Sequence, residues 1–277
     1  MTITVVVAGA TGWAGSAVAR GLHQTPGFTL RGAVARRAAG SDLGETLEGM
    51  CWGVPVTATV EEAMQAGPVD VLVDYTHPLA VKKNVEAALA AGVRAVIGTS
   101  GLSGADLEAL GERAAAQGIG VIAAGNFSLT AALAKHFTLI AARYLRNWEV
   151  LDYANAAKVD APSGTVRELA EALAAAGLHP AADTIPAADV VGIPATRGAQ
   201  VERTRVHALR LPGLVLGFET RFGTPDESLR IVYQAGSSPA PYVSGTLLAV
   251  ERVMGVTGLV RGLDHLLFDP GGSEPGS

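Results

Sequence analysis

Residues 158–165 carry the side chains best suited to chemistry. They read Lys-Val-Asp-Ala-Pro-Ser-Gly-Thr, which brings an amine, two hydroxyls and a flexible turn together. A catalytic loop that binds an anion requires this combination, because ammonium, hydroxyl and backbone N–H groups all donate hydrogen bonds. The four residues before it, 154–157, read Ala-Asn-Ala-Ala and contain no titratable side chain. We therefore expect the catalytic groups on one side of this segment only.

The end of this loop, Ser163-Gly164-Thr165, opens a predicted helix over residues 165–176. Hydroxyls and backbone N–H groups at a helix N-terminus can hold a carboxylate, and a simple N-cap without a ligand is the alternative. Lys158 is one of four lysines in a chain that otherwise uses arginine. A desolvated ammonium can lose its proton near neutral pH, whereas a guanidinium cannot, which favours a catalytic role for Lys158. The alternative is that composition alone left a lysine here.

Three glycines, Gly9, Gly12 and Gly15, follow a β-branched run at residues 2–8 and precede a predicted helix at 16–24. Glycines permit a tight turn and let the backbone approach a pyrophosphate at the helix N-terminus. The pattern is weak by itself in a chain with 34 glycines, but its place after the first predicted strand strengthens it. It predicts nucleotide binding, with a purely structural turn as the alternative.

Arg36 and Arg37 follow the second predicted strand, residues 28–35. Proteins that bind NAD usually place an Asp or Glu there, which accepts a hydrogen bond from the ribose 2′-hydroxyl. Two guanidinium groups could instead hold a 2′-phosphate, so the expected cofactor is NADPH, with NADH possible. The alternative is that both are ordinary solvated charges.

Strands and helices alternate over about the first 125 residues. Further strands are predicted at residues 69–75, 93–98 and 120–124, and helices at 60–66, 79–91 and 105–117. This alternation predicts an α/β fold with a doubly wound, Rossmann-type parallel sheet that is covered by helices on both faces.

After Asn126 the pattern changes. A helix at residues 129–144 leads into strands at 148–153, 206–211, 214–222 and 228–234. Several strands in succession predict a second α+β domain with a mixed sheet. A last helix at 241–254 and the segment 259–268 are expected to return to the first domain. The predicted division is thus 1–126 with 240–270 for dinucleotide binding, and 127–239 for substrate binding and oligomerisation. Residues 270–277 are predicted to be disordered.

Composition excludes several classes of function. Hydrophobic residues make up 49% of the 277, yet no apolar run approaches the ~20 residues that a membrane span needs. A net charge of −5 argues against nucleic acids and anionic membranes as partners. A single cysteine, Cys51, permits no internal disulfide and suits a reducing cytoplasm. No spacing of His, Cys, Asp and Glu indicates a metal site.

Several ordered segments resemble the dihydrodipicolinate reductase family. Residues 158–165 match that family's Lys-x-Asp-Ala-Pro-Ser-Gly-Thr motif throughout, which is the most specific signal. Residues 9–14 resemble its nucleotide turn, and residues 73–78 resemble its Asp-Phe-Thr-x-Pro strand end. Further resemblance lies at Asn84 and at residues 96–101, 126–128, 210–213 and 262–264. The resemblance runs along most of the chain.

The resemblance implies a reductase that uses NADPH or NADH to transfer a hydride to the C=N bond of a small imino acid, and it implies a homotetramer. Lys158 would be a proton donor or electrostatic anchor at the imine, and Ser163, Gly164 and Thr165 would hold a substrate carboxylate. The residues expected at the cofactor are Gly9, Thr11, Gly12, Trp13, Ala14, Arg36, Arg37, Tyr75, Thr76, Gly98, Thr99, Ser100, Ala124, Asn126 and Phe127.

The chain departs from the family just before the lysine. The family motif reads Glu-x-His-His-x-x-Lys, whereas this chain has Asp152, Ala154 and Asn155 at those positions. Alanine cannot transfer a proton, while Asn155 can still hydrogen-bond a substrate carboxylate or carbonyl. The family's Arg-His-Asp-Ser-x-x-Arg stretch is also absent, since residues 231–237 read Ile-Val-Tyr-Gln-Ala-Gly-Ser. Tyr153 and Tyr233 are candidates to supply the missing proton.

These departures predict a reductase that has diverged from the family, acting on a monocarboxylate or a bulkier, less charged cyclic imine. One alternative is an authentic family enzyme of lysine biosynthesis that tolerates the lost histidines. Another is a non-catalytic nucleotide-binding protein, although retention of Lys158 and the complete Ser-Gly-Thr turn argues against it.

Overall fold

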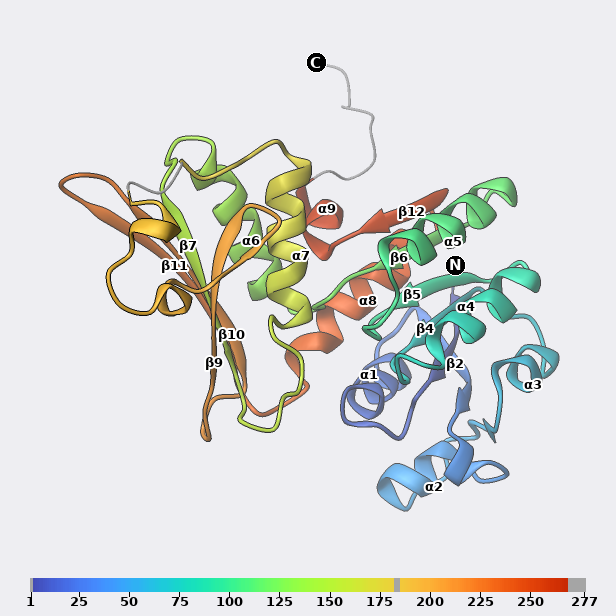
Figure 1. Cartoon of the computed structure of the whole chain (residues 1–277). Helices are drawn as coiled ribbons and strands as arrows, with labels where there is room; N and C mark the ends of the chain where they lie inside the picture. The colour runs from blue at the N-terminus through green and yellow to red at the C-terminus, as the bar shows by residue number, and fades with distance from the viewer. Residues whose placement is uncertain (1, 182–184, 269–277) are drawn as a thin grey trace. The chain divides into compact units, whose positions relative to one another are not determined.

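The computed structural model describes residues 2–181 and 185–268, which form two compact units (Figure 1). Unit 1 comprises residues 2–129 and 239–268, and unit 2 comprises Thr130–Ser238. The tail predicted to be disordered, residues 270–277, lies outside the described residues. Within these residues no helix has the length and apolar character that crossing a membrane would demand.

Unit 1 is built on a seven-stranded sheet in the order β12-β6-β5-β4-β1-β2-β3, with all neighbours parallel. Its strands are β1 (Ile3–Ala8), β2 (Phe28–Val34), β3 (Val56–Thr57), β4 (Val71–Asp74), β5 (Arg94–Ile97), β6 (Gly120–Ala123) and β12 (Gly258–Arg261). The central strands read as continuous apolar runs because both faces of a parallel sheet are covered.

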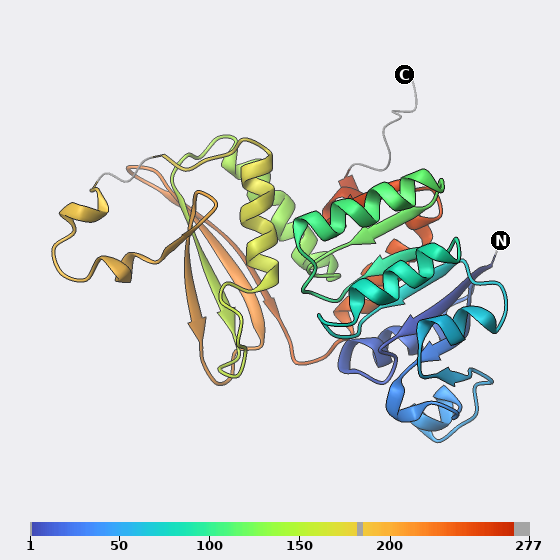
Figure 2. The same ribbon diagram turned by 45° about the vertical axis from the view of Figure 1, so that its right-hand side comes forward.

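Helices cover both faces of this sheet (Figures 1 and 2). The helices of unit 1 are α1 (Trp13–Gln24), α2 (Leu43–Glu48), α3 (Val60–Gln65), α4 (Val81–Ala90), α5 (Gly104–Ala116), α8 (Pro241–Val253) and α9 (Leu263–Phe268). Helix α1 packs beside α8, while α3, α4 and α5 pack side by side in sequence order. The predicted doubly wound, Rossmann-type sheet is confirmed.

Strand order reverses between β1 and β4, because the chain passes from β1 to β2 on one side and reaches β4 on the other. Open α/β sheets bind their ligands at the carboxyl ends of the strands at such a switch point. Both the glycine turn after β1 and the segment after β4 therefore lie where a ligand is expected.

Unit 2 contains the predicted mixed sheet, in the order β11-β10-β7-β9-β8. Strands β7 and β9 are parallel, and the other neighbours are antiparallel. Its elements are α6 (Leu129–Ala142), β7 (Trp148–Ala154), α7 (Gly164–Ala175), β8 (Ala199–Val201), β9 (Thr204–Arg210), β10 (Leu216–Gly223) and β11 (Ser228–Ala235), with 3₁₀ turns at Ala187–Asp189 and Pro194–Arg197.

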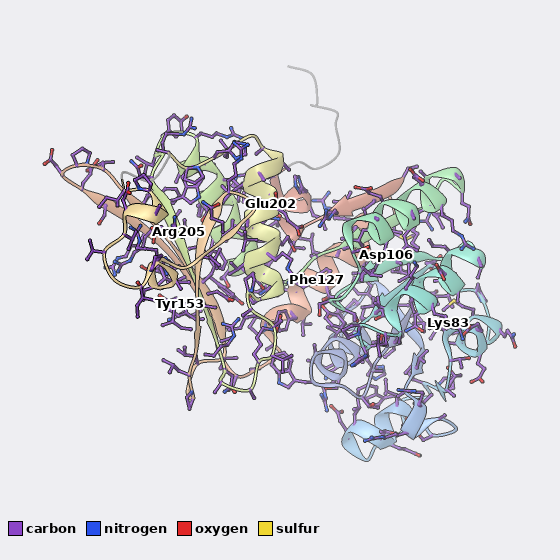
Figure 3. All side chains as sticks on the ribbon, in the orientation of Figure 1. Lys83, Asp106, Phe127, Tyr153, Glu202 and Arg205 are labelled. Atoms are coloured by element: carbon purple, nitrogen blue, oxygen red, sulfur yellow. The ribbon has the colours of Figure 1, made fainter. Side chains whose placement is uncertain are left out.

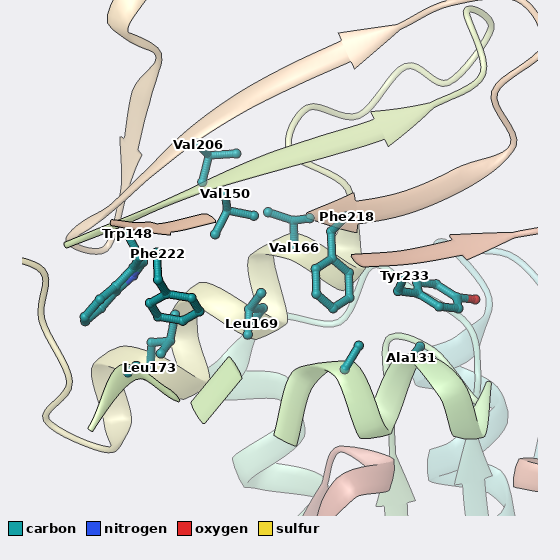
Figure 4. Packing of buried hydrophobic residues seen from close by; sticks show 12 residues of the cluster. Ala131, Trp148, Val150, Val166, Leu169, Leu173, Val206, Phe218, Phe222 and Tyr233 are labelled. Carbon is teal, nitrogen blue, oxygen red and sulfur yellow. The ribbon is translucent and has the colours of Figure 1, made fainter. Parts of the chain in front are cut away.

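The core of unit 2 lies between one face of this sheet and helices α6 and α7. Side chains alternate along β7, so that Trp148 and Val150 face the helices together with Phe218 and Phe222 of β10. Figure 4 shows these side chains over Leu169 and the other apolar residues of α7. Burying a large apolar side chain contributes roughly 1.5–3 kcal/mol, so this cluster fixes which face of β7 points inward.

The structure differs from the sequence prediction in its short elements. Helix α1 begins at Trp13 rather than at residue 16, because Gly15 is accommodated within its first turn. Helix α2 was not predicted, since its six residues include Gly44 and carry little periodic signal. Its start is fixed by Asp42, whose carboxylate accepts hydrogen bonds from the backbone N–H groups of Gly44, Glu45, Trp52 and Val54.

Candidate functional site

The glycine turn after β1 is closely packed against neighbouring backbone. Gly9 has a φ of +79°, and a Cβ there would lie 2.2 Å from the carbonyl oxygen of Tyr75. A Cβ on Gly15 would lie 2.1 Å from the carbonyl oxygen of Gly9. The backbone N–H of Gly12 donates to that same oxygen at 2.9 Å, which closes the turn. The turn therefore demands glycine at positions 9 and 15.

The N-terminus of α1 is open to an anion. Its N-cap is Gly12, which has no side chain to accept a hydrogen bond, and its first turn contains no acidic residue. Thr11, Gly12 and Trp13 are exposed, and Ala14 is half-buried. The indole ring of Trp13 meets the ring of Tyr242 edge-on, with centroids 5.6 Å apart. Free N–H groups at the positive end of a 12-residue helix are suited to a phosphate group.

Arg36 and Arg37 form a 3₁₀ turn directly after β2, the strand next to β1. Both side chains are exposed, and neither guanidinium has an ion-pair or hydrogen-bond partner among residues 2–181 and 185–268. These two cations lie at the carboxyl end of β2, where Rossmann-type sheets contact the 2′-hydroxyl or 2′-phosphate of a dinucleotide's ribose.

A fully buried carboxylate, Asp74, organises the ends of β4 and β5. It accepts hydrogen bonds from the backbone N–H and the hydroxyl of Thr76, at 3.0 and 2.7 Å. It also accepts from the Asn84 amide at 2.8 Å and the Thr99 hydroxyl at 2.6 Å. Because both threonine hydroxyls give their protons to Asp74, they can only accept hydrogen bonds from a ligand. Asp74 was not predicted as a site residue, although its place at the end of an apolar strand could have indicated it.

Aromatic rings lie beside these threonines. The ring of Tyr75 covers Gly98, where a Cβ would lie only 2.3 Å from the Tyr75 ring, and its hydroxyl hydrogen-bonds the Thr246 hydroxyl at 2.7 Å. The buried ring of Phe127, labelled in Figure 3, meets Tyr75 edge-on with centroids 6.1 Å apart. Tyr75 and Phe127 thus place aromatic side chains at the carboxyl ends of β4 and β6, next to the two threonines.

The remaining predicted cofactor residues vary in exposure. Ser100 is exposed, Ala124 is buried, and Asn126 is half-buried. The side-chain oxygen of Asn126, Oδ1, accepts a hydrogen bond from the backbone N–H of Ser128 at 2.8 Å. The Nδ2 atom of the same side chain is buried and has no partner among the described residues. A buried donor without a partner costs free energy unless a ligand or water accepts from it, which makes Asn126 a candidate ligand contact.

In unit 2, the loop after β7 holds the candidate catalytic lysine. The exposed Asn155 side chain accepts a hydrogen bond from the backbone N–H of Ala157, and its carbonyl accepts from the backbone N–H of Lys158 at 3.0 Å. The Lys158 ammonium lies 2.8 Å from a carboxylate oxygen of Asp160. Burial raises the pKa of the Asp160 carboxyl, but this ammonium, together with a backbone hydrogen bond and the charge of Arg210, holds that pKa below its usual value.

Ser163 begins helix α7 and is buried. Its hydroxyl accepts a hydrogen bond from the backbone N–H of Val166 at 3.4 Å, so it is the N-cap of the helix. Gly164 and Thr165 in the first turn are half-buried. The observed hydroxyl contact of Ser163 is thus internal, and its contact with a substrate carboxylate stays a prediction.

The alternation of β7 separates its residues onto two faces of the sheet. Asp152 and Ala154 face the helices and are fully buried, whereas Tyr153, labelled in Figure 3, faces the other way. The Tyr153 hydroxyl donates to Glu219 at 2.8 Å, and burial together with this carboxylate raises the pKa of Tyr153 to about 12. Tyr153 is therefore a poor proton donor, and it points away from Ala154.

Tyr233 lies on the same face as Asp152. Its ring packs against Phe218 in the core, with centroids 5.9 Å apart, and Figure 4 shows its hydroxyl pointing away from that ring. The hydroxyl is buried and has no hydrogen-bond partner among the described residues. Of the two tyrosines considered as proton donors, Tyr233 is the one that shares a face with Asp152 and Ala154, and its hydroxyl has no partner among the described residues.

One further titratable side chain of unit 2, His207, makes a contact between the neighbouring strands β9 and β7. His207 lies 2.7 Å from the Glu149 carboxylate. In the part of the chain that the structure describes, no group of three or more His, Cys, Asp and Glu residues could hold a metal ion.

The parallel sheet, the glycine turn and the open helix N-terminus define a Rossmann-type fold, the class that commonly binds dinucleotides. Models of the dihydrodipicolinate reductase N-terminus and C-terminus match residues 3–127 and 127–267. The chain therefore belongs to the dihydrodipicolinate reductase family, as its motifs predicted. Homologues in this family are NAD(P)H-dependent oxidoreductases.

Individual relatives agree with this family. The chain is 38% identical to 4-hydroxy-tetrahydrodipicolinate reductase of Synechococcus elongatus, over 96% of this chain and 98% of that protein. Its identity to the Moorella thermoacetica enzyme of the same name is also 38%, with the same coverage. The structure of dipicolinate-bound dihydrodipicolinate reductase from Paenisporosarcina sp. TG-14 superposes with a TM-score of 0.79 at 26% identity, covering 96% of this chain and all of that one. An amine dehydrogenase from Mycobacterium smegmatis shares the fold at a TM-score of 0.65, covering 95% of this chain and 96% of that one, but only 16% identity.

Proposed function

We propose that the chain uses NADPH to reduce a small cyclic imino acid, and that its substrate is 4-hydroxy-tetrahydrodipicolinate. The observation that carries the proposal is the complete loop at residues 158–165, with an ammonium at one end and a helix N-terminus at the other. Relatives that cover nearly the whole chain at 35–38% identity bear the name of that activity. They favour it over a reductase of a different imine.

The roles of the residues follow from the two units taken separately. In unit 1, the α1 N-terminus binds the pyrophosphate and Arg36 and Arg37 bind the 2′-phosphate. The Thr76 and Thr99 hydroxyls accept hydrogen bonds from the cofactor's amide. Bound NADPH supplies the hydride. In unit 2, Gly164 and Thr165 hold a substrate carboxylate with backbone N–H groups, and Lys158 donates to the imine nitrogen or to the carboxylate beside it.

A second candidate is the reduction of an imine with a single carboxylate. The observation that favours it is the absence of any cation at Ala154 and Asn155, where the family carries two histidines. Ala154 is fully buried and offers only a methyl group, and Asn155 offers a neutral amide. A second carboxylate bound beside them would lack a charge partner, which costs affinity.

Turnover by the wild-type protein distinguishes these substrates. NADPH oxidation is measured with 4-hydroxy-tetrahydrodipicolinate and with a six-membered cyclic imine that carries one carboxylate. We expect the dicarboxylate to have the higher kcat/KM, and we expect Ala154→His with Asn155→His to raise its kcat/KM further. Preference for the monocarboxylate would establish the second candidate, and oxidation with neither substrate would contradict both.

The dinucleotide preference depends on Arg36 and Arg37. Because hydrogen bonds to charged groups contribute about 1.5–3 kcal/mol, changing both residues to Gln should raise the KM for NADPH by ~10–100-fold and leave the KM for NADH unchanged. Arg31→Gln is the matched control, since Arg31 is an exposed arginine of β2, the strand that precedes the turn containing Arg36 and Arg37. Equal losses with both nucleotides would show that the two arginines do not contact the 2′-phosphate.

We propose further that unit 2 assembles the chain into a homotetramer, as the family resemblance implies. Helices α6 and α7 cover one face of its sheet, while Arg230 and Val232 of β11 are exposed. An exposed β-branched residue beside an arginine is compatible with a protein interface.

A further inference from the structure

Asp152 is a charged residue inside the core of unit 2. It lies on the helix-facing side of β7, is fully buried, and stands where the family carries Glu. Its Oδ2 accepts a hydrogen bond from the backbone N–H of Ser163 at 2.7 Å and another from Arg210 Nη2 at 2.8 Å. The carboxylate therefore touches the last residue before helix α7.

Arg210, the last residue of β9, joins three segments of the chain. Its Nη1 donates to the carbonyl oxygens of Asp152 and Leu209, at 3.1 and 2.9 Å. Its Nη2 donates to the Asp160 carbonyl oxygen at 2.7 Å as well as to the Asp152 carboxylate. One guanidinium group thus connects β7 and β9 with the catalytic loop.

The Arg210 guanidinium is oriented so that it contacts the catalytic loop instead of making a second hydrogen bond with the Asp152 carboxylate. An arginine and a carboxylate usually form two parallel hydrogen bonds. Here a single bond is made, and Asp152 Oδ1 and Arg210 Nε are both buried without a partner among the described residues. The guanidinium is turned so that Nη2 is shared between Asp152 and Asp160. This arrangement gives up one bond within the pair to hold the backbone of Asp160.

Stability alone does not explain a buried ion pair. The cost of removing both charges from water often matches or exceeds their attraction, and apolar residues of similar volume are frequently as stable. What this pair does is fix the segment from Asp160 to Ser163 at both ends. The Asp160 side chain in turn lies 2.8 Å from the Lys158 ammonium.

We propose that Asp152 and Arg210 are positioning residues for the catalytic loop. They hold the Asp160 carbonyl and the Ser163 N–H, and thereby set the place of the Lys158 ammonium and the direction of the α7 N-terminus. Their effect on catalysis rests on the proposed function, but their effect on the loop does not.

Three variants separate charge, geometry and stability. Asp152→Asn keeps an oxygen that can accept from Ser163 and removes the charge. Arg210→Lys keeps the charge, but one ammonium cannot reproduce the fork that reaches both Asp152 and Asp160. Asp152→Leu combined with Arg210→Met replaces the pair by apolar side chains and should stay folded, because replacing a buried ion pair in this way is often close to neutral for stability. Arg221→Gln is the matched control, because Arg221 pairs with Glu219 on the opposite face of the same sheet.

The first measurement needs no substrate. Amide hydrogen exchange of residues 156–165 should become ~10-fold faster or more in the three variants, because the Ser163 N–H loses its acceptor or its neighbours lose their restraint. Exchange in Arg221→Gln should match the wild-type protein. Wild-type exchange rates in the apolar double variant would overturn the proposal, whatever reaction the protein catalyses.

The second measurement is kinetic. Misplacing a catalytic group by about 1 Å can cost ~10²-fold, so kcat/KM for the imine should fall by about that factor while the KM for NADPH stays unchanged. Asp152→Glu restores a carboxylate and should recover most of the activity that Asp152→Asn loses. Full activity in a folded apolar double variant would overturn the proposal. A wild-type protein that reduces no imine contradicts the proposed function instead, and hydrogen exchange then decides the positioning role alone.

Discussion

Replacing Lys158 by methionine should lower kcat for imine reduction by ~10²–10⁴-fold, the range typical for loss of a positioned proton donor. Methionine has a similar length and no charge, so the change removes the ammonium with little change in shape. Since Ala154 brings no titratable group and Tyr153 faces the other side of the sheet, Lys158 is the cation left in the loop. Steady-state NADPH oxidation measures the loss.

A second substitution shows which role Lys158 has. Arg keeps a permanent positive charge but does not release a proton near neutral pH. If Lys158 serves only as an electrostatic anchor, Lys158→Arg should recover much of the activity, whereas a proton donor should not be replaced by arginine. Wild-type kcat in Lys158→Met would contradict both roles. Lys83→Met is the control, because Lys83 is exposed and belongs to unit 1.

The architecture of both units was predictable because their long elements carry strong periodic signals. The buried strands of unit 1 are continuous apolar runs, and strands β8 to β11 of unit 2 follow one another without an α-helix between them. The elements that were missed are short, such as the two-residue β3 and the three-residue β8. Such strands are defined by pairing with a neighbour, at Ala33 for β3 and Val206 for β8, and pairing partners are not visible in a local pattern.

The location of the candidate site was also predictable, but not the environment of its residues. The glycine turn and the loop at residues 158–165 are sequence motifs, and both lie at the start of helices as expected. The sequence does not show that the Ser163 hydroxyl is a buried N-cap, because a helix N-cap and a ligand contact both favour serine. The hydrogen bonds of Asp74 join residues 25 positions apart, so only the fold brings them together.

The two tyrosines illustrate how strand register decides which side chains share a face of the sheet. Both were candidates for the missing proton donor, and nothing in the sequence ranked one above the other. In the structure, Tyr153 is separated from Asp152 and Ala154 by the alternation of one strand. Tyr233 is aligned with Phe218, which is itself aligned with Asp152, so its side chain shares their face. The register of β10 with β7 and β11 therefore distinguishes the two tyrosines, and this register is not visible in the sequence.

Replacing Gly15 by alanine should abolish NADPH binding and lower the free energy of unfolding. The new Cβ would lie 2.1 Å from the Gly9 carbonyl oxygen, and the nearest atoms all belong to the backbone of Gly9 and Ala10, so no flexible side chain can move aside. Overpacking of this kind typically costs about 1–3 kcal/mol, and the turn that must shift is the one expected to bind the pyrophosphate. Chemical denaturation measures the stability loss, and calorimetry with NADPH measures binding.

Gly104→Ala is the control for this effect, because Gly104 begins α5 and a Cβ there meets nothing within 4 Å. It should bind NADPH normally and be as stable as the wild-type protein, or more stable by up to ~1 kcal/mol. Wild-type affinity for NADPH in a folded Gly15→Ala variant would show that the turn does not bind the dinucleotide. Equal losses in both variants would show that the effect comes from removing a helical glycine rather than from the close approach of Gly15 to Gly9.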